Sequence, residues 1–500
     1  MATTTETTTL TLEEIQDFKG KYPKRLWYLF FSEMWERFAF YGMRGMLTVF
    51  MTTQLLMKDD EAQLKYGGIQ AFIYAMTFVG GLFADKLLGF RKSIFWGGLL
   101  MIIGSFTLAV APKELYYIGI SFTIIGTGFF KPNISSMVGS LYSEGDPRRD
   151  AGFGLFYSGI NIGALLGGWL CIVAAKEYSW NLAFALAGIG MIIGLLIFIF
   201  TKRTLGPIGL PPMAGKLSVK KILRNDIFVY AGSLLVIPLI YLMVKNSQYT
   251  DYFMYTVGPA ALIYIIYEIA KLGDKASRQK MIAAMVFIIF SIFFWAFFEQ
   301  AGGSLSLFAL NNLNDTVLGI HMDPNAVNNS SNSVFVVIFS PLAGLLWLWL
   351  AKRKAEPNTV IKFGIGFLFV AVSFYIYYYT RFFADATGKT SLNLFTLAYL
   401  VSTLGELCLS PIGLSLMTTL APRPLHGMMM GMWFLASAYG QYAAGILGAG
   451  MSKTADNATQ MDKLMAYTDG YKNLAIYALI AGIVLIVISP LIKKLMHEVH

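Results

Sequence analysis

The chain has 500 residues, of which 56% are hydrophobic, 15% aromatic and 14% charged, with a mean hydropathy of +0.59 and a formal net charge of +10. Soluble domains carry about 25% charged residues, so this composition excludes an ordinary soluble protein. Several apolar runs reach the roughly 20 residues that a helix needs to cross a bilayer. We therefore predict an all-α polytopic membrane protein.

The N-terminal stretch and the cysteines exclude two further features. The first residues, MATTTETTTLTLEEIQDFKGKYPK, are polar and contain no apolar run after a short basic start, so no cleavable signal peptide is expected. Cys171 and Cys408 both fall in apolar runs, which indicates neither a disulfide framework nor a metal cluster. No metal or other cofactor is expected.

The apolar runs predict fourteen transmembrane spans. They lie at residues 26–55, 67–88, 93–111, 115–141, 152–175, 180–200, 228–245, 252–271, 281–301, 331–350, 361–380, 392–420, 427–450 and 471–492. Of the 39 Lys and Arg residues, 26 fall in or beside connections on the side of the N-terminus and 10 on the opposite side. Because basic residues accumulate in cytoplasmic loops, both termini are predicted to be cytoplasmic. This distribution accounts for the net charge and argues against nucleic-acid binding.

Two basic connections divide the chain into a 6 + 2 + 6 arrangement. The predicted parts are a cytoplasmic tail (1–25), an N-terminal six-helix bundle (26–200), basic linkers with two inserted transmembrane helices (201–280, helices at about 228–271), a C-terminal six-helix bundle (281–492) and a second tail (493–500). The stretch GGLFADKLLGFRK (80–92) has a weak echo at 341–354, which supports two related halves. It also fits a tight cytoplasmic turn with basic topology determinants. Two six-helix halves with a cavity between them are a common transporter plan.

The first span carries charges where an apolar helix is expected. Six of its residues, in SEMWERFAFYG and just beyond, fall within an arc of about 140° of the helix: Glu33, Glu36, Arg37, Phe40, Tyr41 and Arg44. A charge inside a span costs at least ~2.5–3.5 kcal/mol and is usually functional. Carboxylates beside a buried cation can exchange protons, which favours a proton-coupled carrier. The alternative is an ion network that only holds helices together.

Three other spans each carry one ionisable residue, namely Lys131, Glu299 and Glu406. Arg44 and Glu299 lie late on outward-running helices, so we expect them to meet near the outer side. Lys131 and Glu406 lie past the middle of inward-running helices, so we expect them to meet near the cytoplasmic side. Two gate pairs at opposite depths suit alternating access, whereas a channel needs no mutually exclusive gates.

The same side chains predict a zwitterionic cargo. Arg37 and Lys131 can hold a carboxylate, and Glu406 can hold an ammonium group. Further candidates are amides for a peptide backbone and aromatics for side-chain pockets: Asn161, Asn332, Tyr74, Trp295 and Trp433. For each aromatic the alternative is packing or an interfacial position, and for each Asn a bond between helices. A short peptide fits this set.

Six motifs resemble those of the proton-dependent oligopeptide transporters, the POT family, a branch of the major facilitator superfamily. The stretch Glu33-x-x-Glu36-Arg37-Phe38-x-x-Tyr41-Gly42 is similar to the signature ExxERFxYYG. The other five, in the expected order, are GTGFFKPN (126–133), FYSGINIG (156–163), FWAFFEQ (294–300), GELCLSPIGLS (405–415) and MMMGMWFLASA (428–438). The resemblance spans nearly the whole chain.

The resemblance implies roles for individual residues. For proton coupling these are Glu33, Glu36, Arg37 and Glu299. For the peptide carboxylate they are Arg37, Tyr41 and Lys131, for the amino group Asn332 and Glu406, and for the peptide backbone Asn161. It also implies that Arg44 and Glu299 form an outer gate. Phe40 stands where the signature has a tyrosine, so any contact of that hydroxyl is missing here.

The resemblance implies a proton-coupled symporter that imports di- and tripeptides, working as a monomer in the cytoplasmic membrane of a bacterium. The leading alternative is another small solute on the same scaffold, such as nitrate, an amino acid or a peptide-like drug. An enzyme is not expected, because the chain has no HExxH, no GxSxG and no His/Cys ligand cluster.

Overall fold

The computed structural model describes residues 10–143, 145–212, 218–409, 413–422, 425–455 and 458–497. These ranges are almost entirely helical, with one antiparallel ribbon formed by β1 (Thr316–Val317) and β2 (Ile320–His321). The chain divides into two compact units. The prediction of an all-α protein is confirmed.

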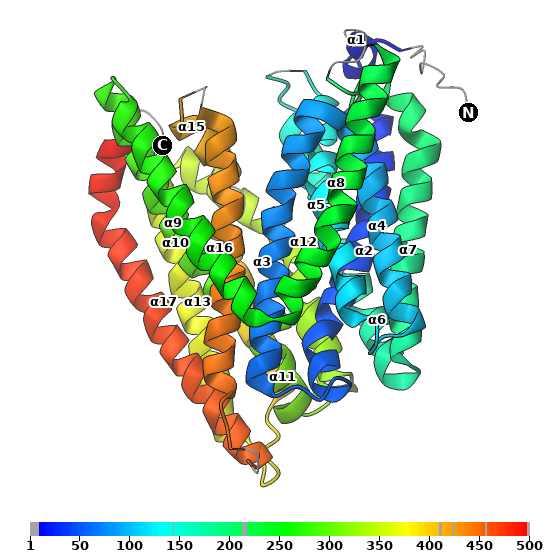
Figure 1. Cartoon of the computed structure of the whole chain (residues 1–500). Helices are drawn as coiled ribbons and strands as arrows, with labels where there is room; N and C mark the ends of the chain where they lie inside the picture. The colour runs from blue at the N-terminus through cyan, green and yellow to red at the C-terminus, as the bar shows by residue number, and fades with distance from the viewer. Residues whose placement is uncertain are drawn as a thin grey trace. The chain divides into compact units, whose positions relative to one another are not determined.

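The first unit contains residues up to Arg44 and Phe72–Lys245 (Figure 1). Its elements are α1 (Leu12–Gln16), the first part of α2 (Lys24–Thr53), the last part of α3 (Asp59–Phe83), η1 (Ala84–Leu88), α4 (Phe90–Val110), α5 (Tyr116–Ser140), α6 (Arg149–Glu177), α7 (Trp180–Thr201), η2 (Lys202–Leu205) and α8 (Val219–Lys245). Helices α4, α5 and α7 pack together, and α8 lies against α5.

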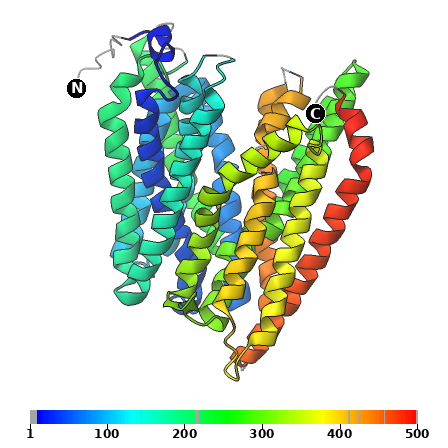
Figure 2. The ribbon, with the colours of Figure 1, turned by 180° about the vertical axis from the view of Figure 1, so that it is seen from behind.

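The second unit contains Gly45–Ala71 and the chain from Asn246 onward. Its further elements are α9 (Ser247–Lys271), α10 (Lys275–Phe298), η3 (Glu299–Gly302), α11 (Ser304–Asn312), β1, β2, α12 (Pro324–Lys352), α13 (Thr359–Tyr379), η4 (Thr380–Phe383), α14 (Leu392–Leu409), α15 (Gly413–Leu420), α16 (His426–Ser452) and α17 (Gln460–Met496). Helix α17, red in Figure 2, packs along α13, and α10 packs along α16.

The predicted spans correspond to long helices in the described ranges. Each of them overlaps one such helix, and 11 helices are long and apolar enough to cross a membrane. Helix α2, which carries Glu33, Glu36 and Arg37, is not among these 11, and neither are α5 and α16. The predicted span 392–420 passes through 410–412, which lie outside the described residues. The total of fourteen spans therefore stays a prediction.

Helices α12 and α17 begin well before the spans predicted at 331–350 and 471–492. At the start of α12 the Asp323 carboxylate accepts a backbone N–H at 2.8 Å, and Pro324 occupies the first turn. At the start of α17, Thr459 and Asp462 form a capping box. Such caps satisfy N–H groups that a helix start leaves unpaired. The apolar pattern marks only the middle of these helices, and the caps set where they begin.

Glycines set the close approach of α4 and α5. A Cβ added to Gly97 would lie 2.6 Å from the carbonyl oxygen of Gly126, and one on Gly126 would lie 2.7 Å from that of Gly97. Gly104 and Gly119 repeat this arrangement two turns away. Small residues let helix backbones pack directly in membranes, where the hydrophobic effect does not drive association.

The basic stretch 80–92 forms the tight turn that its glycines and charges suggested. Gly89 has φ +76° at the junction of η1 and α4, and a Cβ there would lie 2.6 Å from the backbone of Leu210. The Arg91 side chain donates from Nε to the Ile208 carbonyl at 2.7 Å and also bonds the Gly206 carbonyl. Arg91 thus ties the segment after α7 to this turn.

The two inserted helices attach to different units. On α8, Ser233 accepts a hydrogen bond from Trp96 Nε1 at 2.9 Å, and Tyr230 stacks on the Trp96 ring with centroids 4.5 Å apart. On α9, the Asp251 carboxylate accepts a hydrogen bond from Tyr442 of α16 at 2.5 Å. The compact units therefore differ from the predicted six-helix bundles, whose boundaries stay a prediction.

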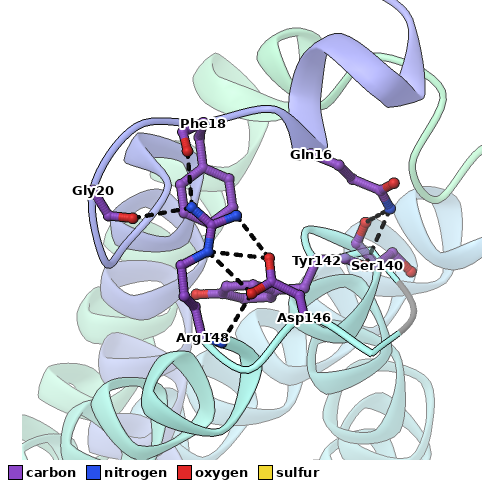
Figure 3. Close-up of polar contacts among 7 residues, drawn as sticks. All are labelled: Gln16, Phe18, Gly20, Ser140, Tyr142, Asp146 and Arg148. Atoms are coloured by element: carbon purple, nitrogen blue, oxygen red, sulfur yellow. Dashed lines mark hydrogen bonds and ion pairs between the residues drawn. The ribbon is translucent and has the colours of Figure 1, made fainter.

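A cluster of polar contacts around Arg148 anchors the N-terminal segment of the first unit (Figure 3). Arg148 pairs with Asp146 at 2.7 Å, donates to the carbonyls of Phe18 and Gly20 at 2.9 and 3.1 Å, and lies 3.9 Å from the Phe18 ring centroid. Gln16 donates to the carbonyls of Ser140, the last residue of α5, and of Tyr142 in the connection that follows. The hydrogen bonds from Arg148 lower the pKa of Asp146 below its usual value. The pair therefore persists above the ordinary Asp pKa of about 4 and is lost only as the pH falls through the lowered value.

The Arg148→Ala variant is expected to release this segment, because it removes both carbonyl contacts and the Asp146 pair at once. Tryptic cleavage after Lys19 and Lys21, followed by mass spectrometry, should become several-fold faster, since proteolysis reports local opening. The neighbouring Arg149, which packs on Phe153 instead, gives the matched control Arg149→Ala. Equal cleavage rates in both variants would contradict the anchoring role.

Candidate functional site

The charged cluster predicted on the first span is buried on α2. Glu33, Glu36 and Arg37 have exposed fractions of 2%, 0% and 2%. Arg37 Nε lies 2.9 Å from Glu33 Oε1 and 2.5 Å from Glu36 Oε2. The i,i+4 spacing of Glu33 and Arg37 brings their side chains together along one face. One guanidinium thus faces two carboxylates.

Lys131 of α5 lies near the same cluster in the first unit. Its Nζ is 4.2 Å from the Tyr74 ring centroid and 5.8 Å from that of Phe40. Arg37 Cζ is 5.3 Å from the Phe40 centroid, so both cations contact this buried ring. Cation–ring attraction depends on the ring face, which phenylalanine supplies as tyrosine does. The substitution at Phe40 therefore keeps this contact with Arg37 and Lys131.

Helix α6 packs directly on the charged cluster. A Cβ added to Gly163 would lie 2.1 Å from the carbonyl oxygen of Met34 and 2.9 Å from Arg37 Cβ, so only glycine fits. Two residues earlier, Asn161 is 6% exposed and donates to the carbonyl of Tyr157 at 2.9 Å. This packing places Asn161 on the helix that covers the cluster.

The remaining predicted residues of α2 lie one turn further along. Tyr41 is half-buried, and its ring meets Phe40 edge-on with centroids 5.2 Å apart. Arg44 is 7% exposed, and its Cζ is 5.7 Å from the Tyr41 centroid. One face of α2 therefore carries Arg37, Tyr41 and Arg44 on successive turns.

In the second unit the structure brings Asn332 and Glu406 together. Asn332 of α12 donates from Nδ2 to Glu406 Oε2 of α14 at 2.8 Å and to Thr403 Oγ1 at 3.2 Å. Glu406 is 8% exposed. A buried carboxylate with an amide partner can receive an ammonium group through charge-assisted hydrogen bonds. The sequence did not single out Thr403, although it lies one turn before Glu406.

Glu299 lies where α10 ends. It is 6% exposed and begins the 3₁₀ turn η3, which leads into α11. One turn earlier, Trp295 is half-buried and packs edge-on against Phe294 and Phe298, with centroids 5.5 and 5.8 Å apart. Trp433 of α16 is also half-buried. These rings take part in packing, and their roles toward a substrate stay predictions.

The two predicted gate pairs divide between the units. Arg44 and Lys131 belong to the first unit, whereas Glu299 and Glu406 belong to the second. Each pair would therefore join residues of different units, and the pairing stays a prediction.

Similarity to known proteins agrees with the motifs. The model of the POT family matches residues 91–465. Peptide transporter YePEPT of Yersinia enterocolitica is 34% identical, covering 94% of this chain and 94% of that protein. Dipeptide and tripeptide permease B of Aeromonas hydrophila is 30% identical, covering 95% of this chain and 94% of the permease. The crystal structure of a mutant peptide transporter POT in complex with alafosfalin is 30% identical, covers 98% of this chain and 100% of that chain, and gives a TM-score of 0.81.

The fold and these similarities define an integral membrane protein of the transporter class. The chain belongs to the POT family. The resemblance predicted from the motifs is thus confirmed, and so is the expectation that the protein is not an enzyme, because the family and its relatives are transporters. The family match begins at residue 91, after the ExxER element at 33–37, so the roles assigned to that element stay predictions.

Proposed function

We propose that the protein is a proton-coupled symporter that imports di- and tripeptides by alternating access. The observation that carries the proposal is the presence of charges of opposite sign on the two units: buried Arg37 and half-buried Lys131 in the first, and buried Glu406 with its partner Asn332 in the second. A short peptide carries a carboxylate at one end and an ammonium group at the other. The relatives named peptide transporter and dipeptide and tripeptide permease support this reading.

In the first unit, Arg37, Tyr41 and Lys131 would bind the peptide carboxylate, and Asn161 would bond the peptide backbone. The guanidinium suits a carboxylate because it can donate two parallel hydrogen bonds. Tyr74, whose ring lies 4.2 Å from Lys131 Nζ, would line a side-chain pocket.

In the second unit, Asn332 and Glu406 would bind the peptide amino group, which fits their hydrogen bond of 2.8 Å. Trp295 and Trp433 would line a pocket for a side chain of the peptide. We also propose that the pairs Arg44–Glu299 and Lys131–Glu406 close in turn as the protein changes conformation.

Glu33, Glu36, Arg37 and Glu299 would couple protons to transport. The α2 cluster holds two carboxylates and one guanidinium, so protonation of one carboxylate leaves a neutral ion pair. When a peptide carboxylate binds Arg37, it competes with Glu33 and Glu36 for the guanidinium. A proton on one glutamate would remove that competition, so proton and peptide would bind together.

The proposed arrangement in the membrane follows the predicted 6 + 2 + 6 spans. The bundles would occupy residues 26–200 and 281–492, with inserted helices at about 228–271 and both termini in the cytoplasm. The protein would work as a monomer in the cytoplasmic membrane of a bacterium. Introduced cysteines in the connection at 381–391, labelled from outside spheroplasts, would test this orientation.

Uptake into reconstituted vesicles tests the proposed function. With an inward proton gradient the protein should accumulate dipeptides or tripeptides in preference to an amino acid or nitrate. If no peptide in a library is taken up by correctly inserted protein, the proposal is wrong. A solute that is accumulated and that peptides do not inhibit would identify a different substrate class.

The Glu406→Gln variant is expected to weaken binding of peptides with a free amino group about tenfold, because a hydrogen bond to a charged group contributes ~1.5–3 kcal/mol. Inhibition constants of a dipeptide and its N-acetyl derivative measure this directly. The acetylated peptide, which lacks the ammonium group, should bind wild type and variant alike. An equal loss for both peptides would contradict the assigned role.

A further inference from the structure

A row of asparagines runs along α12 beside the proposed amine site. Asn325, Asn328 and Asn332 are spaced three and four residues apart, so their side chains lie on one face of the helix. Asn332 bonds Glu406, whereas Asn328 lies one turn nearer the start of α12 and is 1% exposed. A buried amide needs hydrogen-bond partners for both its NH₂ group and its carbonyl oxygen. The partners of Asn328 therefore show which segments it connects.

Asn328 connects three segments of the second unit through its amide. Its Nδ2 donates to the carbonyl oxygen of Ala301 in η3 at 2.8 Å and to Ser306 Oγ of α11 at 3.0 Å. Its Oδ1 accepts a hydrogen bond of 2.6 Å from the Tyr399 hydroxyl of α14. The amide therefore fixes the position of η3 relative to both α12 and α14.

The carbonyl that Asn328 holds lies two residues after Glu299. Carbonyls at the end of an α-helix lack an intrahelical partner, and here Asn328 and Ser306 supply hydrogen bonds to Ala301. Since η3 begins at Glu299, the Ala301 contact helps to set where the Glu299 carboxylate lies.

Asn332, the last residue of this row, lies at the proposed amine site. Thr403 Oγ1 donates to the backbone carbonyl of Tyr399 at 2.8 Å and accepts from Asn332 at 3.2 Å. Asn332 in turn donates to Glu406. Tyr399, Thr403 and Glu406 are spaced four and three apart on α14, opposite Asn328 and Asn332 on α12. Hydrogen bonds thus join α12 and α14 at two levels: one between Asn332 and Glu406, and one between Asn328 and Tyr399 next to η3.

We propose that Asn328 and Tyr399 are positioning residues that couple the amine site at Glu406 to the segment bearing Glu299. This inference rests on the proposed function. An ammonium group on Glu406 takes over part of the hydrogen bonding that Asn332 supplies, which changes the spacing of α12 and α14. The hydrogen-bonded pair of Asn328 and Tyr399, one turn away, shifts with these helices. The bond from Asn328 to the Ala301 carbonyl then moves η3.

The Tyr399→Phe variant tests the proposal because it removes one hydroxyl and keeps the ring. Proton-driven accumulation of a dipeptide should fall about tenfold, the size typical of coupling between linked sites. Counterflow exchange of the same dipeptide and its KM should stay within about twofold, because Glu406 and Asn332 are unchanged. The double variant Asn328→Ala/Tyr399→Phe should be no worse than Asn328→Ala alone, because the two residues act as one unit.

Asn329 gives the matched control. In the described part of the chain its amide bonds only Asn325 of the same helix, so Asn329→Ala should leave both assays unchanged. If Tyr399→Phe behaves like wild type, or loses accumulation and counterflow in equal proportion, the coupling role is overturned. If wild type itself takes up no peptide, the proposed function fails instead, and this inference fails with it.

Discussion

Replacing Glu33 by glutamine is expected to abolish accumulation of peptide against its gradient while leaving counterflow exchange largely intact. Glu33 lies 2.9 Å from Arg37 inside the apolar first unit, and glutamine has nearly the same shape without the charge. The variant therefore resembles the protein with Glu33 permanently protonated. Arg37 would still pair with Glu36 and receive the peptide carboxylate, but release of the proton could no longer drive the cycle.

Two vesicle assays measure this effect. One follows accumulation of labelled peptide under an inward proton gradient, and the other follows counterflow exchange of labelled for unlabelled peptide without a gradient. Glu61→Gln supplies the control, because Glu61 is an exposed carboxylate on α3 that pairs with Lys65 at 3.6 Å. Glu61→Gln should therefore behave like wild type in both assays, whereas Glu33→Gln should lose accumulation only. Wild-type rates for Glu33→Gln in both assays would refute the coupling role of Glu33.

The second large effect is expected from Gly163→Val, which forces α6 away from α2. Even the first added carbon would lie 2.1 Å from the Met34 carbonyl oxygen. Overpacking of this kind costs typically ~1–3 kcal/mol, and here it also displaces Arg37, whose Cβ would lie 2.9 Å away. We expect a lower thermal midpoint in detergent and loss of peptide binding.

Gly154→Val on the same helix is the matched control, since a Cβ added there meets no heavy atom within 4 Å. Thermal stability followed by size-exclusion chromatography after heating compares the two variants. A Gly163→Val protein as stable as Gly154→Val would show that α6 and α2 can separate without cost, contrary to the close packing described above.

Much of the helical layout could be predicted because it depends on local pattern. Apolar runs located the helices, and helical periodicity placed Glu33 and Arg37 on one face of α2, where they form an ion pair. The ends of the helices were harder to predict. Helix α17 begins at Gln460, eleven residues before the predicted span 471–492, because its start is set by the capping box of Thr459. Apolar periodicity carries no information about such polar caps.

The candidate site could be predicted most directly where a charge stands out in an apolar helix. Lys131, Glu299 and Glu406 were found in this way, whereas Asn328 and Tyr399 were missed because buried amides and phenols are common in membrane helices. Their importance depends on which backbone carbonyl lies opposite, here Ala301 in η3, and that contact joins parts of the chain far apart in sequence. Only the folded arrangement reveals it.

Coupling of protons to peptide transport can be measured as peptide-driven proton movement. Vesicles containing the protein and a trapped pH dye would start with no pH gradient, and a dipeptide would be added outside. We expect the vesicle interior to acidify with wild-type protein and not with Glu33→Gln. Peptide uptake by wild-type protein without any acidification would show that transport is not coupled to protons.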